Sequence, residues 1–89
     1  MLFEWDPAKS DATFRQRGFD FAYAARVLTG DRLETEDTRS GYGEIRMKAI
    51  GQVGPDILVV IYTMRNEAVR IISARLANKR ERSQWQSRA

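Results

Sequence analysis

The chain has 89 residues, enough for a single domain over residues 1–89 with one modest core. It contains no cysteine and no histidine, which excludes disulfides, thiolate metal sites and every catalytic arrangement that needs an imidazole. The net charge is +3 and 43% of the residues are hydrophobic, a composition that is typical of folded chains and not of disordered ones.

The N-terminal residues predict a short strand and a first helix. Residues 2–5 are apolar except for Glu4, as in an edge strand. Asp6 and Pro7 then form a helix start, because the carboxylate can accept hydrogen bonds from first-turn amides and proline fits the first helical position. We expect this helix to end near Arg17, with Gly18 as its left-handed terminator.

The period of the apolar residues changes once along the rest of the chain. Asp20 is placed to cap a second helix over residues 21–28, where apolar side chains recur at helical spacing. From residue 31 onwards the pattern is that of strands, separated by turn sequences that contain glycine or asparagine. This pattern predicts four strands, at about residues 31–39, 44–49, 57–63 and 68–75.

The last predicted helix has a capping box and one large apolar residue. Asn78 precedes Glu81 by three residues, which predicts a helix over residues 79–88. Because about ten polar residues form only a marginal helix alone, we expect Trp85 to dock it on the body of the protein or on a partner. The summed order is β-α-α-β-β-β-β-α, an α+β fold with three helices packed on an antiparallel sheet.

Basic side chains are concentrated towards the C-terminus. Residues 1–64 carry 8 basic and 10 acidic side chains, whereas residues 65–89 carry 7 basic and 2 acidic ones. If the predicted strands share one sheet, cations of two strands and of the last helix can gather on one side and bind phosphates. These cations are Arg46, Lys48, Arg70, Arg75, Lys79, Arg80 and Arg82. The alternative is a solvated surface in which the strand arginines pair with Glu44 or Glu34.

RNA cleavage is compatible with a chain that lacks histidine. The RNA 2′-hydroxyl is itself the nucleophile, arginines can neutralise the phosphate, and a lysine, glutamate or tyrosine can act as acid or base. Tyr42, in a glycine-rich loop, is placed to stack on a base or to bond a phosphate. Glu34 and Glu36 share a strand face and could hold a cation, but an exposed strand face is the favoured interpretation. We expect no metal and no cofactor.

The order of these residues also resembles a known family. Near the start, FEWDPAK at residues 3–9 is followed by a glycine after the first helix and by a second helix that begins with phenylalanine. Further similarities are Arg39, YGE at 42–44 with Arg46, AIG at 49–51, LVV at 58–60 with Tyr62 and Thr63, RIISAR at 70–75, Ala77, and ER at 81–82. Over nearly the whole chain, these residues resemble the BrnT toxins of bacterial type II toxin–antitoxin pairs.

The resemblance implies a compact domain related to the RelE-type ribonuclease toxins and RNA cleavage that arrests translation. It also implies a BrnA antitoxin, which would neutralise the toxin by binding it and repress the shared operon through its own DNA-binding domain. We therefore expect a toxin–antitoxin hetero-oligomer that reaches operator DNA through the antitoxin. Because the N-terminal sequence does not have the pattern of a signal peptide and no apolar run is long enough to span a membrane, the cytoplasm is the expected compartment.

The sequence departs from the family at two places. The family usually has Lys-His-Gly at the end of the first helix, where this chain has Gln16, Arg17 and Gly18. It often has a tyrosine in the last helix, where this chain has Trp85. An indole cannot donate a proton as an acid at physiological pH, whereas Arg17 still supplies a cation. The alternative hypothesis is therefore a weak or inactive member that acts as an antitoxin-bound co-repressor or a nucleic-acid-binding module.

The predicted activity is that of a metal-independent endoribonuclease. The residues that we predict to take part in catalysis are Lys9, Tyr42, Glu44, Arg46, Arg70 and Arg75. The four cations among them would contact phosphate or the transition state, and the tyrosine and glutamate would move or position protons. The residues that we predict to bind RNA are Arg17, Lys48, Lys79, Arg80 and Arg82. We predict that Trp85 contacts the antitoxin.

Overall fold

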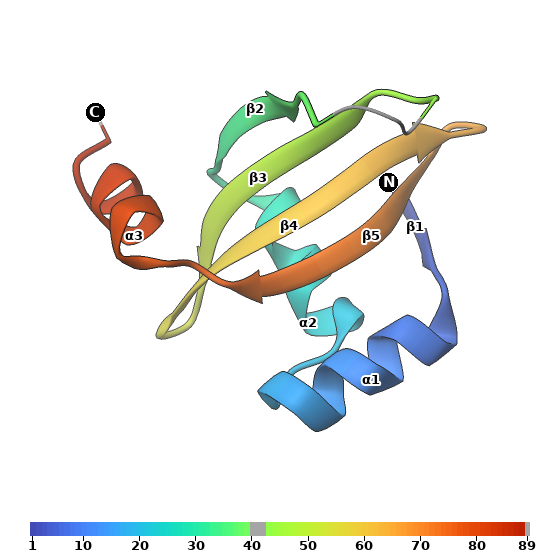
Figure 1. Cartoon of the computed structure of the whole chain (residues 1–89), viewed down its shortest axis with the longest axis horizontal. Coiled ribbons are helices and arrows are strands. Elements are labelled where there is room, and N and C mark those ends of the chain that lie inside the picture. Colours follow the sequence, from blue (N-terminus) through green and yellow to red (C-terminus); the bar gives the residue numbers. More distant parts are fainter. Residues whose placement is uncertain (40–42, 89) are drawn as a thin grey trace.

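The structure, a computed structural model, describes residues 1–39 and 43–88 and is built around one five-stranded sheet with the order β1-β5-β4-β3-β2 (Figure 1). The strands are β1 (Leu2–Trp5), β2 (Leu33–Asp37), β3 (Arg46–Val53), β4 (Asp56–Arg65) and β5 (Ala68–Leu76). The helices are α1 (Pro7–Arg17), α2 (Phe21–Ala25) and α3 (Lys79–Gln86), and a 3-10 turn (Arg26–Thr29) follows α2. In the described part of the chain, no helix has the length and apolar character needed to cross a bilayer.

The sheet is mixed, because β1 pairs with β5 in parallel while the other neighbouring strands are antiparallel. The α+β class is confirmed, but the prediction of a wholly antiparallel sheet is wrong at this edge. Between β1 and β2, the chain passes through α1 and α2 and moves from one edge of the sheet to the other (Figure 1). Whether β1 runs parallel or antiparallel to β5 depends on this long crossover. The short sequence of β1 itself carries no signal for its direction.

The predicted helix boundaries are confirmed for α1 and differ for α2. Asp6 accepts a hydrogen bond from a first-turn amide at 2.9 Å, and Gly18 ends α1 with a φ of 85°. Asp20 caps α2 by accepting from the amide of Tyr23. The α-helix stops at Ala25, and the remaining residues of the predicted helix form the tighter 3-10 turn.

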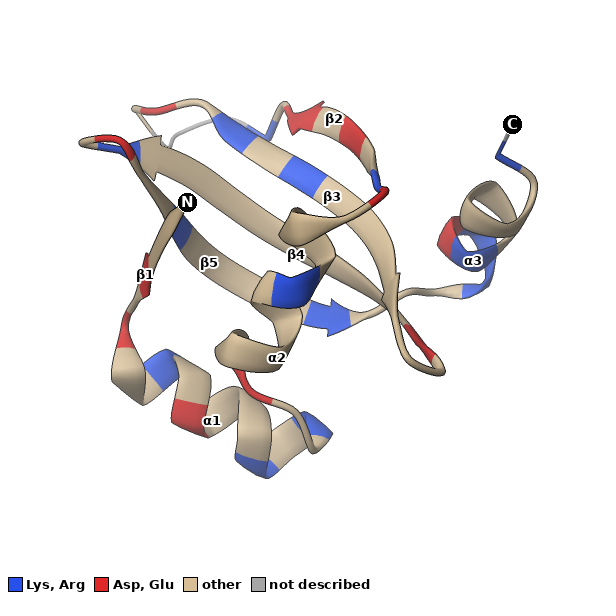
Figure 2. Cartoon of the chain, turned by 180° about the vertical axis from the view of Figure 1, so that it is seen from behind, with Lys and Arg blue, Asp and Glu red and all other residues tan. Residues whose placement is uncertain are grey.

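The larger core lies between the sheet and the two N-terminal helices. Its largest fully buried side chains come from α2, the 3-10 turn, β4 and β5, and they are Phe21, Val27, Leu58, Val60 and Ile71. Figure 2 views the sheet from this side, with α2 in front of it. The hydroxyl of Ser10 in α1 accepts from the amide of Phe21 at 3.0 Å, which ties the two helices together.

A smaller core lies on the opposite face of the sheet, beneath α3. It consists of Ile50, Val59, Ile61, Ala77 and Trp85. The predicted capping box of α3 is confirmed in both directions: Asn78 accepts from the amide of Glu81, and the Glu81 side chain accepts from the amide of Asn78. The helix therefore docks on the body of this chain, at one end of the sheet (Figure 1).

The third strand is longer than predicted, because β3 continues through Gly51 to Val53. An ideal Cβ at Gly51 would lie 2.8 Å from Cγ1 of Val27 and 3.3 Å from the carbonyl oxygen of Asp31. Val27 is 1% exposed, and close packing leaves its stiff side chain little room to move. The approach of the 3-10 turn to β3 therefore requires a residue without a side chain.

We expect Gly51→Ala to lower the free energy of unfolding by about 1–3 kcal/mol, the cost of overpacking a filled core. Gly30→Ala is the matched control, because Gly30 has a φ of −138° and no atom within 4 Å of its ideal Cβ. The control should change stability by less than about 0.5 kcal/mol. Urea denaturation followed by circular dichroism measures both variants, and equal stabilities would contradict the close approach at Gly51.

Candidate functional site

The cations of β3 lie on the face of the sheet that carries α3, which we call the α3 face. Along β3, Met47 and Ala49 pack into the larger core, so the alternating side chains of Arg46 and Lys48 leave the strand on the other side. Both residues are half-buried. In Figure 2, basic positions lie on β3, β5 and α3, whereas acidic positions lie on β2.

The sheet register brings the cations of β3 and β5 together across β4. Arg70 pairs with Thr63 of β4. Arg46 lies one position before Met47, which pairs with Tyr62, so continuing this register places Arg46 on the other side of Thr63. In the adjacent row, Ile61 of β4 lies between Lys48 and β5. Residues that are paired across neighbouring strands share a face of the sheet. The predicted gathering of strand cations on one side of the sheet is therefore present in the structure.

A buried glutamate of α3 holds two of these cations. Glu81 is 4% exposed, and its two carboxylate oxygens accept from the guanidinium of Arg75 at 2.6 and 2.8 Å. The ammonium of Lys48 lies 2.7 Å from Oε2 of Glu81, and the amide of Asn78 donates to Oε1 at 2.9 Å. Because these donors compensate for the lost hydration of the carboxylate, Glu81 joins α3 to both β3 and β5.

These contacts also fix protonation states. The hydrogen bonds from Arg75, together with Lys48 and the amide of Asn78, hold the pKa of Glu81 well below its usual range, although burial acts in the opposite direction. The hydrogen bond to Glu81 in turn raises the pKa of Arg75. Glu81 is therefore a carboxylate throughout the neutral range, and it orients the two cations without serving as a proton donor.

A pocket of about 340 Å³ opens beside these ion pairs, and we call it the cation pocket. Its lining residues are Asp37, Arg39, Lys48, Ile61, Ser73 and Arg75. Arg39 lies 2.6 Å from Asp37, and hydrogen bonds from Arg39 lower the pKa of the Asp37 carboxyl. Three cations and one serine hydroxyl surround this hollow, a set of donors that suits a phosphate group.

The other two strand cations have more distant acidic partners. Arg46 lies 3.4 Å from Glu44, and Arg70 lies 3.6 Å from Glu4 of β1. The predicted alternative, in which the arginines pair with nearby glutamates, is thus present for Arg46 with Glu44. The side chains of Arg46 and Arg70 remain 20% and 29% exposed.

The remaining predicted site residues do not join this cluster. Lys9 and Arg17 are exposed on α1, which packs against α2 and β5, so the structure does not bring them together with the strand cations, and their roles stay predictions. The three predicted cations of α3 are exposed on that helix, beside the cluster. Tyr42 lies outside the described residues.

Trp85 is an internal anchor of α3 in this structure. It is 3% exposed, and its Nε1 donates to Gln52 of β3 at 3.0 Å. The guanidinium of Arg88 lies 3.4 Å from the centroid of the indole ring and covers it further. Of the two expected docking partners of Trp85, the body of this chain is therefore the one that the structure shows, and the predicted contact of Trp85 with the antitoxin stays a prediction. A single apolar residue on a polar helix indicates a contact, but not which molecule supplies the other side.

Four residues of the cation pocket were not among the predicted site residues, and they are Asp37, Arg39, Ile61 and Ser73. Ser73 lies two positions before Arg75 on β5, so the strand period could have placed it on the same face. Arg39 ends the segment 31–39 that was predicted as a strand, but β2 stops at Asp37, so strand alternation does not place the Arg39 side chain. The ion pairs of Glu81 also had no signal in the nearby sequence. Lys48 is distant from Glu81 in the sequence, and Arg75 faces Glu81 only after folding.

The α3 face supplies fixed charge and hydroxyl groups. Its described groups with shifted pKa values are Asp37, Arg75 and Glu81, and every one of these shifts moves away from neutral pH. On the opposite face, Tyr62 donates to Glu34 at 2.9 Å, and burial together with this bond raises the pKa of Tyr62 to about 12. Within residues 1–39 and 43–88, no three acidic side chains gather as a metal-binding group. Preorganised cations of this kind stabilise charge that develops on a phosphate.

Comparison with known families gives one match. A model described as the ribonuclease toxin, BrnT, of a type II toxin–antitoxin system matches residues 5–81. The matched span contains β2 to β5 and reaches Glu81, and it stops before Trp85. No curated protein matches the chain.

We expect Glu81→Gln to lower the free energy of unfolding at pH 7 by about 2–3 kcal/mol, because it removes the charge that compensates Arg75 and Lys48 while keeping a side chain suited to the capping box. The folded-state pKa of Glu81 is lowered, so its stabilising effect is present above the unfolded-state pKa of about 4.3 and is lost as the pH falls. The difference between parent and variant should therefore shrink on acidification to about pH 2.

Glu36→Gln is the control for this experiment, since Glu36 is an exposed carboxylate of β2. Its unfolding free energy at pH 7 should match that of the parent protein to within about 0.5 kcal/mol. Urea denaturation between about pH 2 and pH 7 measures all three proteins. A Glu81→Gln variant as stable as the Glu36→Gln variant at pH 7 would show that the ion pairs do not join α3 to the sheet.

Proposed function

The chain belongs to the BrnT family of ribonuclease toxins from type II toxin–antitoxin systems, since the family model matches residues 5–81 of its 89 residues, and we propose that it is a metal-independent endoribonuclease. Its substrate in this proposal is RNA whose cleavage arrests translation in the cytoplasm. The observation that carries the proposal is the juxtaposition of Arg46 and Arg70 across Thr63, next to the cation pocket.

The proposed reaction uses the 2′-hydroxyl of the RNA as nucleophile. Its oxygen attacks the adjacent phosphorus, the bond to the 5′-oxygen of the next nucleotide breaks, and a cyclic phosphate and a 5′-hydroxyl end are formed. Arg46 and Arg70 stabilise the charge on the phosphoryl oxygens. Glu44, beside Arg46, and Tyr42 are the groups that we propose for moving or positioning the protons.

The ion-paired cations have a different part in this proposal. Arg75 and Lys48 are held in place by Glu81, so they offer a preorganised site for a phosphate that neighbours the scissile one. Their orientation does not need to change when RNA binds, which lowers the entropy that binding costs. The exposed cations of α3 would extend the contact along the RNA backbone and make binding depend on salt.

An antitoxin partner follows from the family, and we propose that it is a BrnA-like protein that neutralises the toxin in a hetero-oligomer. Operator DNA would be bound through the DNA-binding domain of that antitoxin. The adjoining open reading frame tests this part of the proposal. A small acidic protein with a ribbon-helix-helix pattern, co-purifying with the toxin, is the expected result.

A non-catalytic co-repressor is the second candidate function, and one observation favours it. Trp85 stands where many family members have a tyrosine, and in this chain the indole is buried and engaged with Gln52. It is therefore not placed to take the part of an exposed phenol. Purified protein incubated with RNA in the presence of a chelator separates the two functions, because only the ribonuclease cleaves the RNA under those conditions.

We expect the purified protein to cleave RNA with and without EDTA, and Arg46→Ala or Arg70→Ala to slow cleavage by about a hundredfold each, the usual effect of removing one transition-state contact. Induced expression of the parent protein should stop bacterial growth, whereas either variant should permit it. Single-turnover cleavage of a labelled RNA measures the rates.

Arg15→Ala is the matched control, because it removes one arginine from the exposed surface of α1 and leaves the α3 face unchanged. Its cleavage rate should equal that of the parent protein. Thermal unfolding confirms that all three variants are folded. Cleavage by Arg46→Ala and Arg70→Ala at the rate of Arg15→Ala would remove both arginines from the proposed site.

A further inference from the structure

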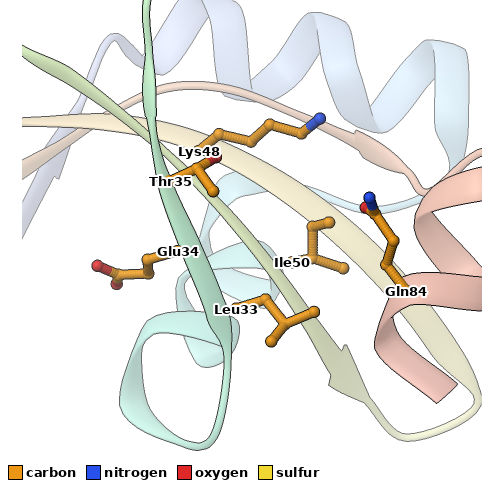
Figure 3. A pocket seen from close by; sticks show the side chains of 6 residues that line it. All are labelled: Leu33, Glu34, Thr35, Lys48, Ile50 and Gln84. Atoms are coloured by element: carbon orange, nitrogen blue, oxygen red, sulfur yellow. The ribbon is translucent and has the colours of Figure 1, made fainter. Parts of the chain in front are cut away.

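A second pocket, of about 390 Å³, lies between β2, β3 and α3 and shares Lys48 with the cation pocket (Figure 3). We call it the β2–α3 pocket. Its lining residues are Leu33, Glu34, Thr35, Lys48, Ile50 and Gln84. In Figure 3 the side chains of Leu33, Ile50 and Gln84 face one another across the pocket, whereas Glu34 points away on the other side of β2.

We propose that the β2–α3 pocket receives one base of the bound RNA and that Gln84 determines which base is preferred, an inference that rests on the proposed ribonuclease function. A base needs apolar surface against its ring and hydrogen-bonding groups at its edge. Leu33 and Ile50 are paired across β2 and β3 and supply the apolar surface. The amide of Gln84 supplies both donors and an acceptor, which can distinguish one base edge from another.

The position of Lys48 favours a nucleotide as the occupant. Lys48 lines both pockets, and its ammonium is held 2.7 Å from Oε2 of Glu81. A base in the β2–α3 pocket therefore places an adjoining phosphate towards the cation pocket, where Arg39 and Arg75 also lie. An apolar side chain of a protein partner fits the pocket floor equally well, but it brings no anion for these neighbouring cations.

The helix offers a matched control for Gln84. Gln86 is the same residue type, is exposed on the same helix and lies two residues further on, which is about 200° around the helix axis. It does not line the pocket. Both substitutions to alanine favour the helix equally, so a difference between them reports on the pocket and not on the stability of α3.

The experiment compares the cleavage-site sequences of the parent protein, Gln84→Ala and Gln86→Ala on the same messenger RNA, determined by sequencing the new 5′-hydroxyl ends. We expect the parent protein and Gln86→Ala to prefer one base at one position beside the cut. Gln84→Ala should reduce that preference at least about fivefold, the factor that corresponds to the loss of one base-edge contact, while it still cleaves RNA. An unchanged preference in Gln84→Ala would overturn the inference.

A binding measurement separates this inference from the proposed function. Fluorescence anisotropy with 2′-O-methyl hexamers of adenosine, cytidine and uridine needs no cleavage. We expect dissociation constants for the parent protein that differ at least about fivefold between bases and that converge in Gln84→Ala. If the parent protein fails to cleave RNA but shows this pattern, the ribonuclease proposal fails and the base pocket stands. Equal affinity of the parent protein for all three hexamers would overturn the base pocket. The base pocket would also be overturned if the only defect of Gln84→Ala were weaker binding of the antitoxin.

Discussion

A carboxylate that is 4% exposed needs several donors to remain ionised, and Glu81 finds them on two strands and at the start of its own helix. This one group fixes the distance between α3 and the sheet, the orientation of Arg75 and the position of Lys48. Trp85, one turn further along α3, adds the apolar contact that a short polar helix lacks. The helix and the cationic face therefore depend on the same few contacts.

The cations of the α3 face differ in how they are held, and we propose different functions for them. Arg75 and Lys48 are bound to Glu81, so they contribute charge with a fixed direction, whereas Arg46 and Arg70 have more distant acidic partners. Fixed cations suit the binding of a ground-state phosphate. In the proposed reaction, Arg46 and Arg70 act on the phosphate whose charge increases. Because the chain contains no histidine, positioning and charge have to carry most of the proposed catalysis.

Much of the fold could be predicted from the sequence where the signal is local. The caps at Asp6, Asp20 and Asn78 are side-chain contacts within one helical turn, and the strand period placed Arg46 and Lys48 on one face. Structural features that depend on contacts between distant parts of the chain were not predicted. The parallel direction of β1 is one, and the 3-10 turn, whose Val27 packs against Gly51, is another.

The candidate site shows the same limit. Its cations were predicted as a group because alternation along each strand is a local property, but Lys9 and Arg17 were added on family resemblance and lie on α1. Glu81 was predicted only as a helix cap, since nothing near it in the sequence indicates its contact with Arg75. The burial of Trp85 likewise depends on Gln52 and β3, which no helical pattern can reveal.

The proposed function depends on the binding of RNA to the α3 face. This binding can be tested by titrating the isotope-labelled protein with a 2′-O-methyl RNA at low salt and following the amide NMR signals. The RNA cannot be cleaved, and each amide signal reports on binding near its own residue. We expect chemical-shift changes concentrated around Lys48 on β3, Ser73 on β5 and the neighbouring turns of α3. Changes confined to α1 and α2, or no change at all, would contradict binding to the α3 face.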